Sequence, residues 1–238
     1  NAYFRRRFGY RVHKISVDAG LSCPNRDGRV GRGGCIYCNA RGSGTGAHAR
    51  GESVTRQIER GRDFLARRYK AQGFLAYFQS FSNTYAPLPH LEALYREALA
   101  VPGVLGLAIG TRPDCVDGAV LDLLAELART RLVWVEYGLQ SAWDRTLEAI
   151  GRGHDAACFA RAVAATRARG LPVCAHAILG LPGEGPEEMH GTAYFLARLP
   201  VDGVKLHLLY VVRGTPLEAL YASGAYRCPH HPNAATLP

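Results

Sequence analysis

Three of the chain's seven cysteines lie in one short, glycine-rich loop, and their types and spacing could support metal chemistry. Residues 22–39 read SCPNRDGRVGRGGCIYCN, so Cys23, Cys35 and Cys38 have the spacing C-x11-C-x2-C. Three thiols are too many for one disulfide and one too few for a closed tetrahedral zinc site. The intervening glycines let the backbone fold tightly around a group that the sulfurs hold. The spacing therefore predicts a metal-binding loop.

Two kinds of metal group suit this loop. A cubane iron–sulfur cluster has four irons, so three thiolates would leave one iron open to a ligand from outside the protein. The alternative is a structural zinc site in which His48, ten residues after Cys38, supplies the fourth ligand. Cys228 could form a second metal site with His230 and His231, although a frayed tail is the simpler interpretation. The remaining cysteines are predicted to fill the core: Cys115, Cys158 and Cys174.

The composition is that of an ordinary globular protein. The 238 residues suffice for one large domain or two small ones, and 47% hydrophobic with 21% charged residues excludes a disordered chain. No apolar stretch approaches the roughly 18 residues that span a bilayer, and no signal core opens the sequence. An odd number of unevenly spread cysteines argues against a secreted disulfide framework. We therefore expect a cytoplasmic protein with no membrane partner.

The net charge of +9 makes a polyanion a candidate partner, because Lys and Arg gain affinity by releasing counterions from phosphates. Nearly all of this positive charge is arginine. Two arginine runs could bind RNA phosphates, one near the N-terminus (Arg5, Arg6 and Arg7) and one inside the cysteine loop (Arg26, Arg29 and Arg32). Solvated surface arginines are an equally fair interpretation of each run.

Strand-like and helix-like segments alternate strictly along the chain, which is the pattern of a parallel sheet covered by helices. The predicted strands are residues 11–18, 74–79, 104–110, 132–140, 172–179 and 203–212. The predicted helices begin at Ser53, Pro89 and Asp117 or cover residues 155–170, 186–198 and 216–222. Continuous apolar runs suit strands buried on both faces, and right-handed crossovers curl such strands into a barrel. The sequence therefore predicts an α/β fold, a partial (β/α)6 TIM-like barrel.

Polar residues lie at the ends of five successive predicted strands. In a parallel barrel the carboxyl ends of the strands form the working face. The residues predicted to converge there are Gln79, Ser80, Thr111, Arg112, Glu136, Gln140, His176, Lys205 and His207. Any one of them could instead be an outward-facing, solvated residue. The cysteine loop follows the first strand, so we expect it at the same end of the barrel.

These features together resemble the radical S-adenosylmethionine (SAM) superfamily. The shared features are three cysteines after the first strand, an aromatic residue, Tyr37, before the last cysteine, and six βα units that end in polar residues. The commonest motif there is C-x3-C-x2-C, and this chain lengthens the first gap. The longer gap is similar to the branch of the YhcC and YtqA proteins, which resembles the catalytic subunit of Elongator. FQSFSNTYAP, IGTRPDC, EYGLQS and ILGLPGE also fit that branch, and the resemblance covers about residues 3–227.

The resemblance implies the cofactors and the residues that bind them. Cys23, Cys35 and Cys38 would bind a [4Fe-4S] cluster whose fourth iron chelates SAM. The residues that would contact SAM are Tyr37, Gln79, Ser80, Gln140, Arg152, Gly180 and Gly183. Of these, Gln140 and Arg152 match a pair that contacts the cofactor in coproporphyrinogen oxidases. One electron would cleave SAM to methionine and a 5′-deoxyadenosyl radical, with flavodoxin or ferredoxin as the expected electron donor.

The substrate that the resemblance implies is tRNA. Elongator relatives act on wobble uridines, and the YtqA-like branch would convert a carboxymethylaminomethyl side chain on that uridine to aminomethyl. Arg112 is the candidate for binding a substrate carboxylate, because a guanidinium grips carboxylate through a two-nitrogen fork. His176 and His207 are the other candidate catalytic residues, and His176 falls where coproporphyrinogen oxidases have an Asp.

Residues 1–226 are predicted to form the radical SAM core domain, and residues 227–238 a tail that would belong to a truncated C-terminal extension. Two alternatives for the function stay open at this point. One is a radical SAM enzyme that acts on a small molecule or a peptide. The other is a non-enzymatic, zinc-bearing RNA-binding domain.

Overall fold

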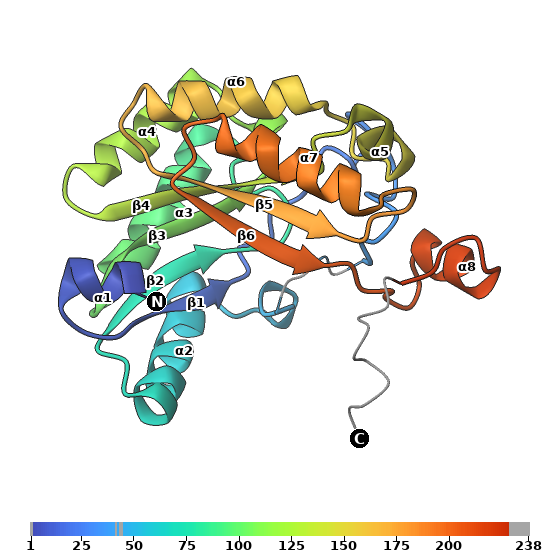
Figure 1. Ribbon diagram of the computed structural model, residues 1–238. Coiled ribbons are helices and arrows are strands. Elements are labelled where there is room, and N and C mark those ends of the chain that lie inside the picture. The colour runs from blue at the N-terminus through green and yellow to red at the C-terminus, as the bar shows by residue number, and fades with distance from the viewer. Residues whose placement is uncertain (1, 41, 43–44, 229–238) are drawn as a thin grey trace.

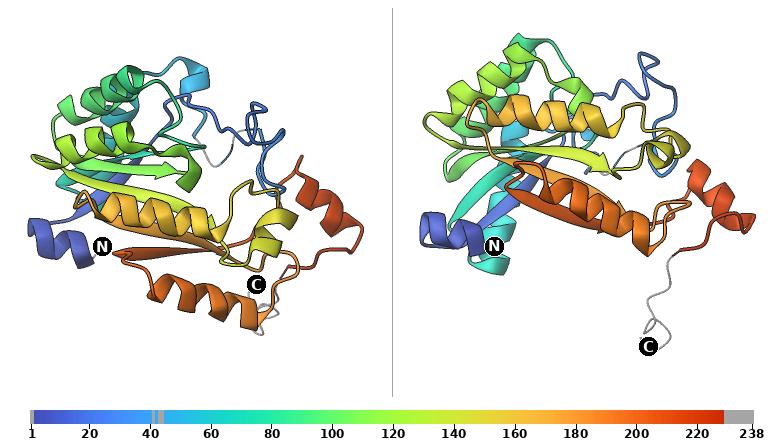
Figure 2. Two further views of the ribbon diagram at one scale, coloured as in Figure 1. Left: turned by 90° about the horizontal axis from the view of Figure 1, so that it is seen from above. Right: turned by 45° about the horizontal axis from the view of Figure 1, so that its top comes forward.

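The computed structural model describes residues 2–40, 42 and 45–228, and its centre is one sheet of parallel strands (Figure 1). The strands lie side by side in sequence order: β1 Val12–Val17, β2 Gly73–Phe78, β3 Val104–Thr111, β4 Leu132–Gln140, β5 Val173–Leu179 and β6 Gly203–Leu208. The sheet curls into a half-barrel with helices packed on its outer side (Figure 2). The predicted α/β partial barrel is confirmed. Most of the predicted tail, residues 229–238, lies outside the described residues, as do His230 and His231.

Several helices begin where the sequence predicts. Ser53 caps α2 (Val54–Tyr69) and Asp117 caps α4 (Gly118–Ala128), each by accepting a hydrogen bond from the backbone N–H three residues on. Pro89 lies in the first turn of α3 (Leu88–Ala100). The remaining predicted helices are α6 (Ala156–Arg167), α7 (Pro186–Ala197) and α8 (Pro216–Ala222), and 3-10 turns occur at η1 (His48–Arg50) and η2 (Pro113–Cys115). Apolar side chains from α2, α3, α4 and α6 pack on the outer face of the sheet and form the main core.

Two short helices are not predicted: α1 (Ala2–Phe8) and α5 (Asp144–Ala149). Helix α1 lies at the amino ends of the strands (Figure 1). Its Phe4 and Phe8 pack against a second apolar cluster that contains Trp134, and Tyr3 meets the Trp134 ring edge-on at 5.4 Å between centroids. The helix therefore covers this end of the barrel. The signal in the sequence is a pair of aromatic residues four positions apart.

Strand β6 is shorter and more exposed than the sequence predicts. Its pairing ends at Leu208, because the neighbouring β5 ends at Leu179, whereas the prediction runs to residue 212. Three apolar side chains on its outer face are 47%, 63% and 49% exposed: Val204, Leu206 and Leu208. The expectation of strands buried on both faces is therefore wrong for this edge strand. Only its inward-facing residues are in position to contribute to a site.

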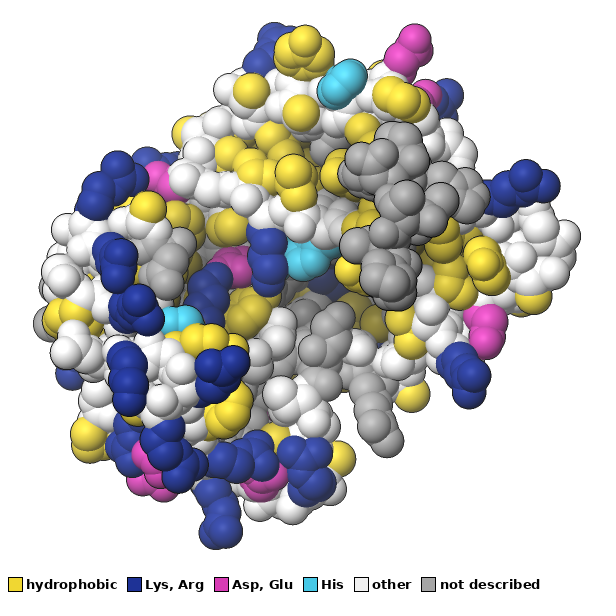
Figure 3. Space-filling model, turned by 60° about the horizontal axis from the view of Figure 1, so that its bottom comes forward, with side chains coloured by type: hydrophobic (Ala, Val, Ile, Leu, Met, Phe, Trp, Pro, Cys, Tyr) yellow, Lys and Arg dark blue, Asp and Glu magenta, His cyan; other side chains and the backbone are white. Residues whose placement is uncertain are grey.

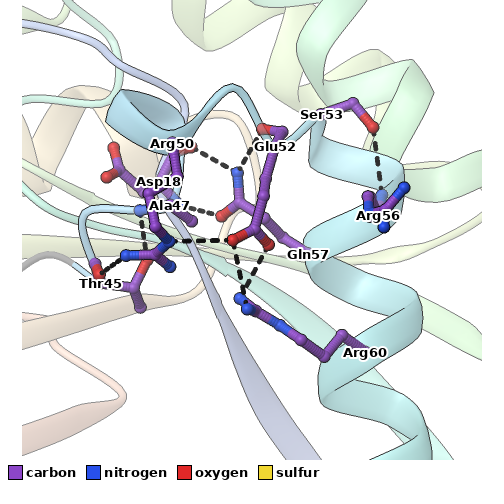
Figure 4. Close-up of polar contacts among 9 residues, drawn as sticks. All are labelled: Asp18, Thr45, Ala47, Arg50, Glu52, Ser53, Arg56, Gln57 and Arg60. Atoms are coloured by element: carbon purple, nitrogen blue, oxygen red, sulfur yellow. Dashed lines mark hydrogen bonds and ion pairs between the residues drawn. The ribbon is translucent and has the colours of Figure 1, made fainter.

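The segment between the cysteine loop and α2 is held against the end of β1 (Figure 4). Gln57 is buried, and its side-chain amide donates to the carbonyls of Asp18 and Glu52 at 2.8 and 3.1 Å. Its oxygen accepts from the Asp18 N–H at 2.8 Å. The Glu52 carboxylate in turn binds Arg50 and Arg60. These contacts fix the point at which the chain leaves the cysteine loop.

Candidate active site

One cavity at the carboxyl ends of the strands gathers most of the predicted site residues. It encloses about 880 Å³, including the space at its open mouth, and all three cysteines of the loop line it. The other predicted residues that line it are Tyr37, Gln79, Ser80, Thr111, Arg112, Glu136, Gln140, Arg152, His176, Lys205 and His207. Figure 3 shows Lys or Arg, Asp or Glu, and His side chains together in a hollow of the molecule. The structure thus brings these residues together, and their roles remain to be tested.

The cysteine loop is anchored to segments far away in the sequence. The Asn25 side chain is buried and donates to the Gly151 carbonyl at 2.6 Å, and the Ile36 N–H donates to the Ile150 carbonyl at 3.0 Å. The first turn of α8 donates to the Ile36 carbonyl at 3.0 Å. A glycine is needed at Gly31, since a Cβ there would lie 2.2 Å from the Asn25 Oδ1. Asn25 is not among the predicted residues. In the sequence, only the neighbouring glycines indicate that this position is closely packed.

Two arginines donate toward the loop sulfurs. Arg152 Nη1 lies 3.7 Å from Cys35 Sγ, and Arg26 Nη1 lies 3.6 Å from Cys38 Sγ. Burial raises the pKa of the Cys35 thiol, but the charge and hydrogen bond of Arg152 outweigh it and lower that pKa overall. Burial and the Cys35 charge raise the pKa of Cys38 despite Arg26. Because thiolates are the metal-binding form, Arg152 favours ligation at Cys35. Arg26 also donates to the Asn39 carbonyl of this loop, at 3.0 Å, and its role in RNA binding stays a prediction.

The arrangement does not suit a single zinc ion. In the described part of the chain, the only three His, Cys, Asp or Glu ligand atoms within 4.8 Å of one another belong to Glu136, Cys174 and His176. The loop sulfurs are more widely spread, whereas thiolates on one zinc ion lie about 3.8 Å apart because each Zn–S bond is about 2.3 Å long. His48 packs on Gly20, whose added Cβ would lie 2.3 Å from the imidazole ring, and it does not line the cavity. The zinc alternative is therefore wrong.

Gly138 leaves space for the side chains of Gln140 and Arg152, which are both predicted to contact SAM. Arg152 Nη2 donates to the Gly138 carbonyl at 2.6 Å. A Cβ on Gly138 would lie 2.6 Å from Gln140 Nε2 and 2.8 Å from Arg152 Nη2, so a larger residue would push both side chains away. The sheet register shifts between Gly138 and Gln140, where Gln140 adopts φ +78°. Gly138 is not among the predicted residues. It could have been identified as a glycine inside a predicted strand, because such glycines often mark a close approach of another group to the backbone.

Several polar groups near the three loop cysteines, which we call the cysteine end of the cavity, are free to bind a cofactor. Among the residues that line the cavity, five buried atoms have no hydrogen-bond partner in the described structure: Tyr37 Oη, Ser82 Oγ, Arg112 Nη1, Gln140 Oε1 and Arg152 Nε. Burial raises the pKa of Tyr37 well above its usual value, so its buried hydroxyl keeps its proton beside Cys35. Because buried polar atoms are normally hydrogen-bonded, these atoms fit a polar ligand next to the thiols. The residues present therefore suit a cluster with SAM beside it.

Arg112 lines the cavity, but the two nitrogens expected to bind a substrate carboxylate already bind one from the protein. Nε and Nη2 donate to the two carboxylate oxygens of Asp114 at 2.8 and 2.7 Å. Burial raises the pKa of Asp114, and the hydrogen bonds and charge of Arg112 lower it by more. The 3-10 turn after Arg112 brings this carboxylate back onto the guanidinium. The expectation that the fork grips a substrate carboxylate is therefore revised for the Nε–Nη2 edge, and Nη1 and the second N–H of Nη2 are left for a ligand.

The loop after β2 holds Gln79 and Ser80 at the cavity wall. Gln79 Nε2 donates to Ser16 Oγ at 2.9 Å, and the buried Asn83 side chain donates to the carbonyls of Ser80 and Gly110 at 2.9 and 2.8 Å. Asn83 is not a predicted residue. Its signal is an Asn within a polar turn, since such side chains bond readily to nearby backbone. The predicted contacts of Gln79 and Ser80 with SAM remain predictions.

Gly180 and Gly183 form the turn after β5 but do not line the cavity. Both adopt left-handed backbone conformations, with φ of +81° and +79°, which glycine allows. The Gly180 carbonyl accepts a hydrogen bond from the Tyr226 hydroxyl at 2.8 Å. Their predicted packing against adenine remains a prediction.

A second set of polar side chains lies deeper in the half-barrel. We call it the inner polar cluster, and it consists of Lys14, Tyr77, Glu136, His176, Lys205 and His207. The buried Glu136 binds Lys14 through Oε1 and His176 Nε2 through Oε2, the latter at 2.8 Å. Burial raises the pKa of Glu136, but these partners lower it to about 2. The His207 ring lies 5.1 Å from that of His176. Burial, His176 and Lys205 lower the pKa of His207 to about 4, so it is neutral at pH 7.

The close group of Glu136, Cys174 and His176 is not built to bind a metal. Lys14 occupies one oxygen of the Glu136 carboxylate. Burial and the charge of Glu136 raise the pKa of Cys174 to about 11, which keeps the thiol protonated. Glu136 and His176 therefore act as part of the polar lining of the cavity, whereas Cys174 packs against the apolar cluster that contains Trp134.

Comparisons with known proteins agree with this site. Residues 26–196 match the Radical SAM superfamily. The protein YhcC of Escherichia coli (strain K12) is 44% identical over 220 residues, which are 92% of this chain and 70% of that protein. The protein YtqA of Bacillus subtilis (strain 168) is 42% identical over 224 residues, 94% of this chain and 70% of that protein. The chain therefore belongs to the radical SAM superfamily and, within it, to the family of YhcC and YtqA.

More distant relatives cover the chain in part. Elongator complex protein 3 of Saccharomyces cerevisiae is 29% identical over 139 residues, 57% of this chain and 24% of that protein. A tRNA uridine(34) acetyltransferase of Dehalococcoides mccartyi is 35% identical over 125 residues, 51% of this chain and 27% of that protein. The solved structure of Elp3 from the archaeon Methanocaldococcus infernus, with its N-terminus deleted, has a TM-score of 0.68 at 16% identity and covers 92% of this chain and 50% of its own. This structural likeness shows a shared fold.

Membership of the superfamily decides between the classes of function. The chain is a radical SAM enzyme, and its cofactors are a [4Fe-4S] cluster and SAM. The alternative of a non-enzymatic, zinc-bearing RNA-binding domain is therefore wrong. Within the described residues, no helix has both the length and the apolar character needed to cross a bilayer.

Proposed function

We propose that this enzyme modifies the wobble uridine of tRNA, converting a carboxymethylaminomethyl side chain there to aminomethyl. Two partial relatives support tRNA as the partner, since one is named as a tRNA uridine(34) acetyltransferase and the other as Elongator complex protein 3. The observation that carries the proposal is a surface beside β1, one of the two edges of the half-barrel, that is rich in cations with no ion-pair partner among the described residues.

This surface, which we call the RNA face, consists of exposed cations on α1, on the start of β1 and on the end of α2: Arg5, Arg6, Arg11, Arg67, Arg68 and Lys70. Residues 2–17 and 64–91 contain no Asp or Glu. None of the six cations forms an ion pair with a described residue, whereas Arg60 and Arg96 are ion-paired. A band of Lys and Arg side chains along one side of the hollow is visible in Figure 3. Uncompensated cations of this kind suit phosphates.

Aromatic rings lie among these cations. Phe64 and Tyr69 are 56% and 41% exposed, and the Arg68 guanidinium lies 5.4 Å from the centroid of the Tyr69 ring. Because the Tyr69 ring is already stacked on that of His13, with 5.1 Å between centroids, Phe64 is the ring that offers a platform on which nucleic-acid bases stack. Strand β1 is about 20 Å long at about 3.3 Å per residue. RNA phosphates on this face therefore lie about one strand length from the cysteine end of the cavity.

Different residues of the cavity would have different roles in such a reaction. When bound, the cluster and SAM would supply a 5′-deoxyadenosyl radical that takes a hydrogen atom from the carboxymethyl CH2 of the substrate. Loss of a second electron, with the oxidised cluster as its acceptor, and addition of one water would then release this group as glyoxylate and leave the aminomethyl amine. The loop cysteines hold the cluster, while Arg152, Gln140 and Arg112 Nη1 offer hydrogen bonds to SAM. Glu136 holds His176 through Nε2 and leaves Nδ1 for the substrate. His207, neutral at pH 7, is able to accept a proton or a hydrogen bond from the substrate amine. Flavodoxin or ferredoxin remains the predicted electron donor.

The direct test is anaerobic incubation of the reconstituted enzyme with SAM, a reductant and bulk tRNA. Mass spectrometry should find 5′-deoxyadenosine together with loss of the carboxymethyl group from the modified wobble uridine. Formation of 5′-deoxyadenosine with no changed nucleoside would contradict the proposal and favour a small molecule or a peptide as the substrate.

The RNA face is tested by binding of tRNA at several salt concentrations. The triple variant Arg67→Gln, Arg68→Gln, Lys70→Gln should bind more weakly, and the slope of log affinity against log salt should fall by about three, one for each lost phosphate contact. The matched control is Arg129→Gln, Arg161→Gln, Arg198→Gln, which removes three exposed cations elsewhere on the molecule. Equal losses of tRNA affinity in both variants would exclude the RNA face as the surface that binds tRNA.

A further inference from the structure

Lys205 reaches across the half-barrel from its last strand. It lies on β6, where it pairs in register with His176 of β5. Its Nζ is 5.0 Å from the centroid of the Tyr77 ring on β2. Lys14, from β1, places its Nζ 4.7 Å from the same centroid. Two ammonium groups from opposite edges of the sheet therefore meet at one ring.

The charges around this ring do not balance. Glu136 is the only carboxylate among the described residues that line the cavity, and both of its oxygens are taken, one by Lys14 and one by His176. Lys205 forms no ion pair with any described residue. Burial lowers the pKa of Lys205, and the charge of Glu136 offsets this in part. The neutral His207 beside it adds no negative charge. One positive charge therefore stands uncompensated in a half-buried site.

The cavity limits what could compensate that charge. An ammonium group is a compact charge with three donors, and among the described residues that of Lys205 has an aromatic neighbour, the Tyr77 ring, but no ion-pair partner. Lys205 lines the same cavity as Cys35 and Gln140, so a group that it binds lies in the cavity where substrate and cofactor would meet. A small anion with one charge fits this position. A phosphate of the RNA backbone and a carboxylate on the reacting side chain share that chemistry, but only the carboxylate is attached to the group that must enter the cavity.

We propose that Lys205, supported by the Tyr77 ring and His207, binds the carboxylate of the substrate side chain and so selects the carboxymethylated uridine. The inference rests on the proposed function. It replaces Arg112, whose fork is bound to Asp114, as the group that recognises the carboxylate. Lys205 is thereby a specificity-determining residue, and Arg112 belongs to the cysteine end of the cavity.

The test compares two forms of one purified tRNA, one with carboxymethylaminomethyluridine at the wobble position and one with unmodified uridine. The wild-type enzyme should bind the first about tenfold more tightly, the effect of one charge-assisted hydrogen bond. Lys205→Met should lose this preference, and Lys205→Arg, which keeps the charge, should retain most of it. Arg161→Met, an exposed arginine on α6, is the control and should bind like the wild type. Lys205→Met should also form less converted nucleoside for each 5′-deoxyadenosine released.

The outcomes separate the two proposals. If Lys205→Met keeps the full preference for the carboxylated tRNA, or loses affinity for both tRNAs equally, the inference is overturned while the proposed function stands. If the wild-type enzyme converts neither tRNA, the proposed function fails, and the inference falls with it. Loss of the preference in Lys205→Met and its retention in Lys205→Arg would support both.

Discussion

The two ends of the cavity hold their positive charges in different ways. At the cysteine end, Arg152 is fixed by the Gly138 carbonyl and Arg112 by the Asp114 carboxylate. In the inner polar cluster, Lys14 is bound to Glu136, whereas Lys205 lies against an aromatic ring and has no anionic partner among the residues that the structure describes. Cations fixed by the protein suit charges that stay in place, such as the thiolates of a resident cluster. A cation without a fixed partner suits an anion that arrives and leaves with each substrate.

The largest expected effect is at the cysteine end. Cys35→Ala should prevent cluster assembly, because two thiolates remain where the loop provides three ligands, and formation of 5′-deoxyadenosine should be abolished. Iron content and visible absorbance after anaerobic reconstitution measure the first, and product analysis the second. Cys158→Ala removes a thiol on α6 outside the cavity and should retain both. A Cys35→Ala protein that keeps its iron and cleaves SAM would show that this loop is not the cluster site.

A smaller effect is expected from a substitution at Gly138, which the side chains of Gln140 and Arg152 both approach. Gly138→Ala places a Cβ 2.6 Å from Gln140 Nε2, which should raise the KM for SAM and cost about 1–3 kcal/mol of stability, as overpacking does. SAM kinetics and denaturant unfolding measure the two effects. The control Gly118→Ala lies in a helix, and its added Cβ approaches only Arg169, at 3.5 Å. An unchanged KM for SAM in Gly138→Ala would mean that this pair does not contact the cofactor.

The smallest effect concerns the inner polar cluster. The pKa of His207 is about 4 in the folded protein against an ordinary value of 6.5, because of burial and the charges of His176 and Lys205. Between pH 6.5 and pH 4 the unfolded state therefore binds more protons, so stability should fall as the pH falls through this range. His207→Asn should flatten this slope in denaturant unfolding. Burial and Arg152 also lower the pKa of His154, to about 3, so part of the slope should remain. Parallel curves for variant and wild type would show that folding does not lower the pKa of His207.

Elements defined by local patterns could be predicted from the sequence. Apolar periodicity located all six strands, Ser53 and Asp117 marked helix starts, and the spacing of the three loop cysteines indicated one metal group. Polar residues at strand ends converge because parallel strands place their carboxyl ends together. This convergence placed Lys205 and His207 in one cavity with the cysteines.

Features that depend on distant partners could not be predicted. Asn25 matters because Gly151 lies against it, more than a hundred residues away in the sequence. Gly138 matters because two side chains approach its backbone. The exposed outer face of β6 follows from its position at the sheet edge, and an apolar run gives no sign of that. The bound fork of Arg112 is different, because Asp114 lies only two residues away and is visible in the sequence.

The central claim is that one cavity has a cofactor end and a substrate end. The rate of 5′-deoxyadenosine formation and the yield of converted nucleoside, measured together in Arg152→Met and Lys205→Met, test it most directly. Arg152→Met should lower the rate of SAM cleavage by about 10- to 100-fold with or without tRNA, because it removes charge-assisted hydrogen bonds. Lys205→Met should lower mainly the yield of nucleoside per 5′-deoxyadenosine. Equal losses of both quantities in the two variants would contradict the division of the cavity into these two ends.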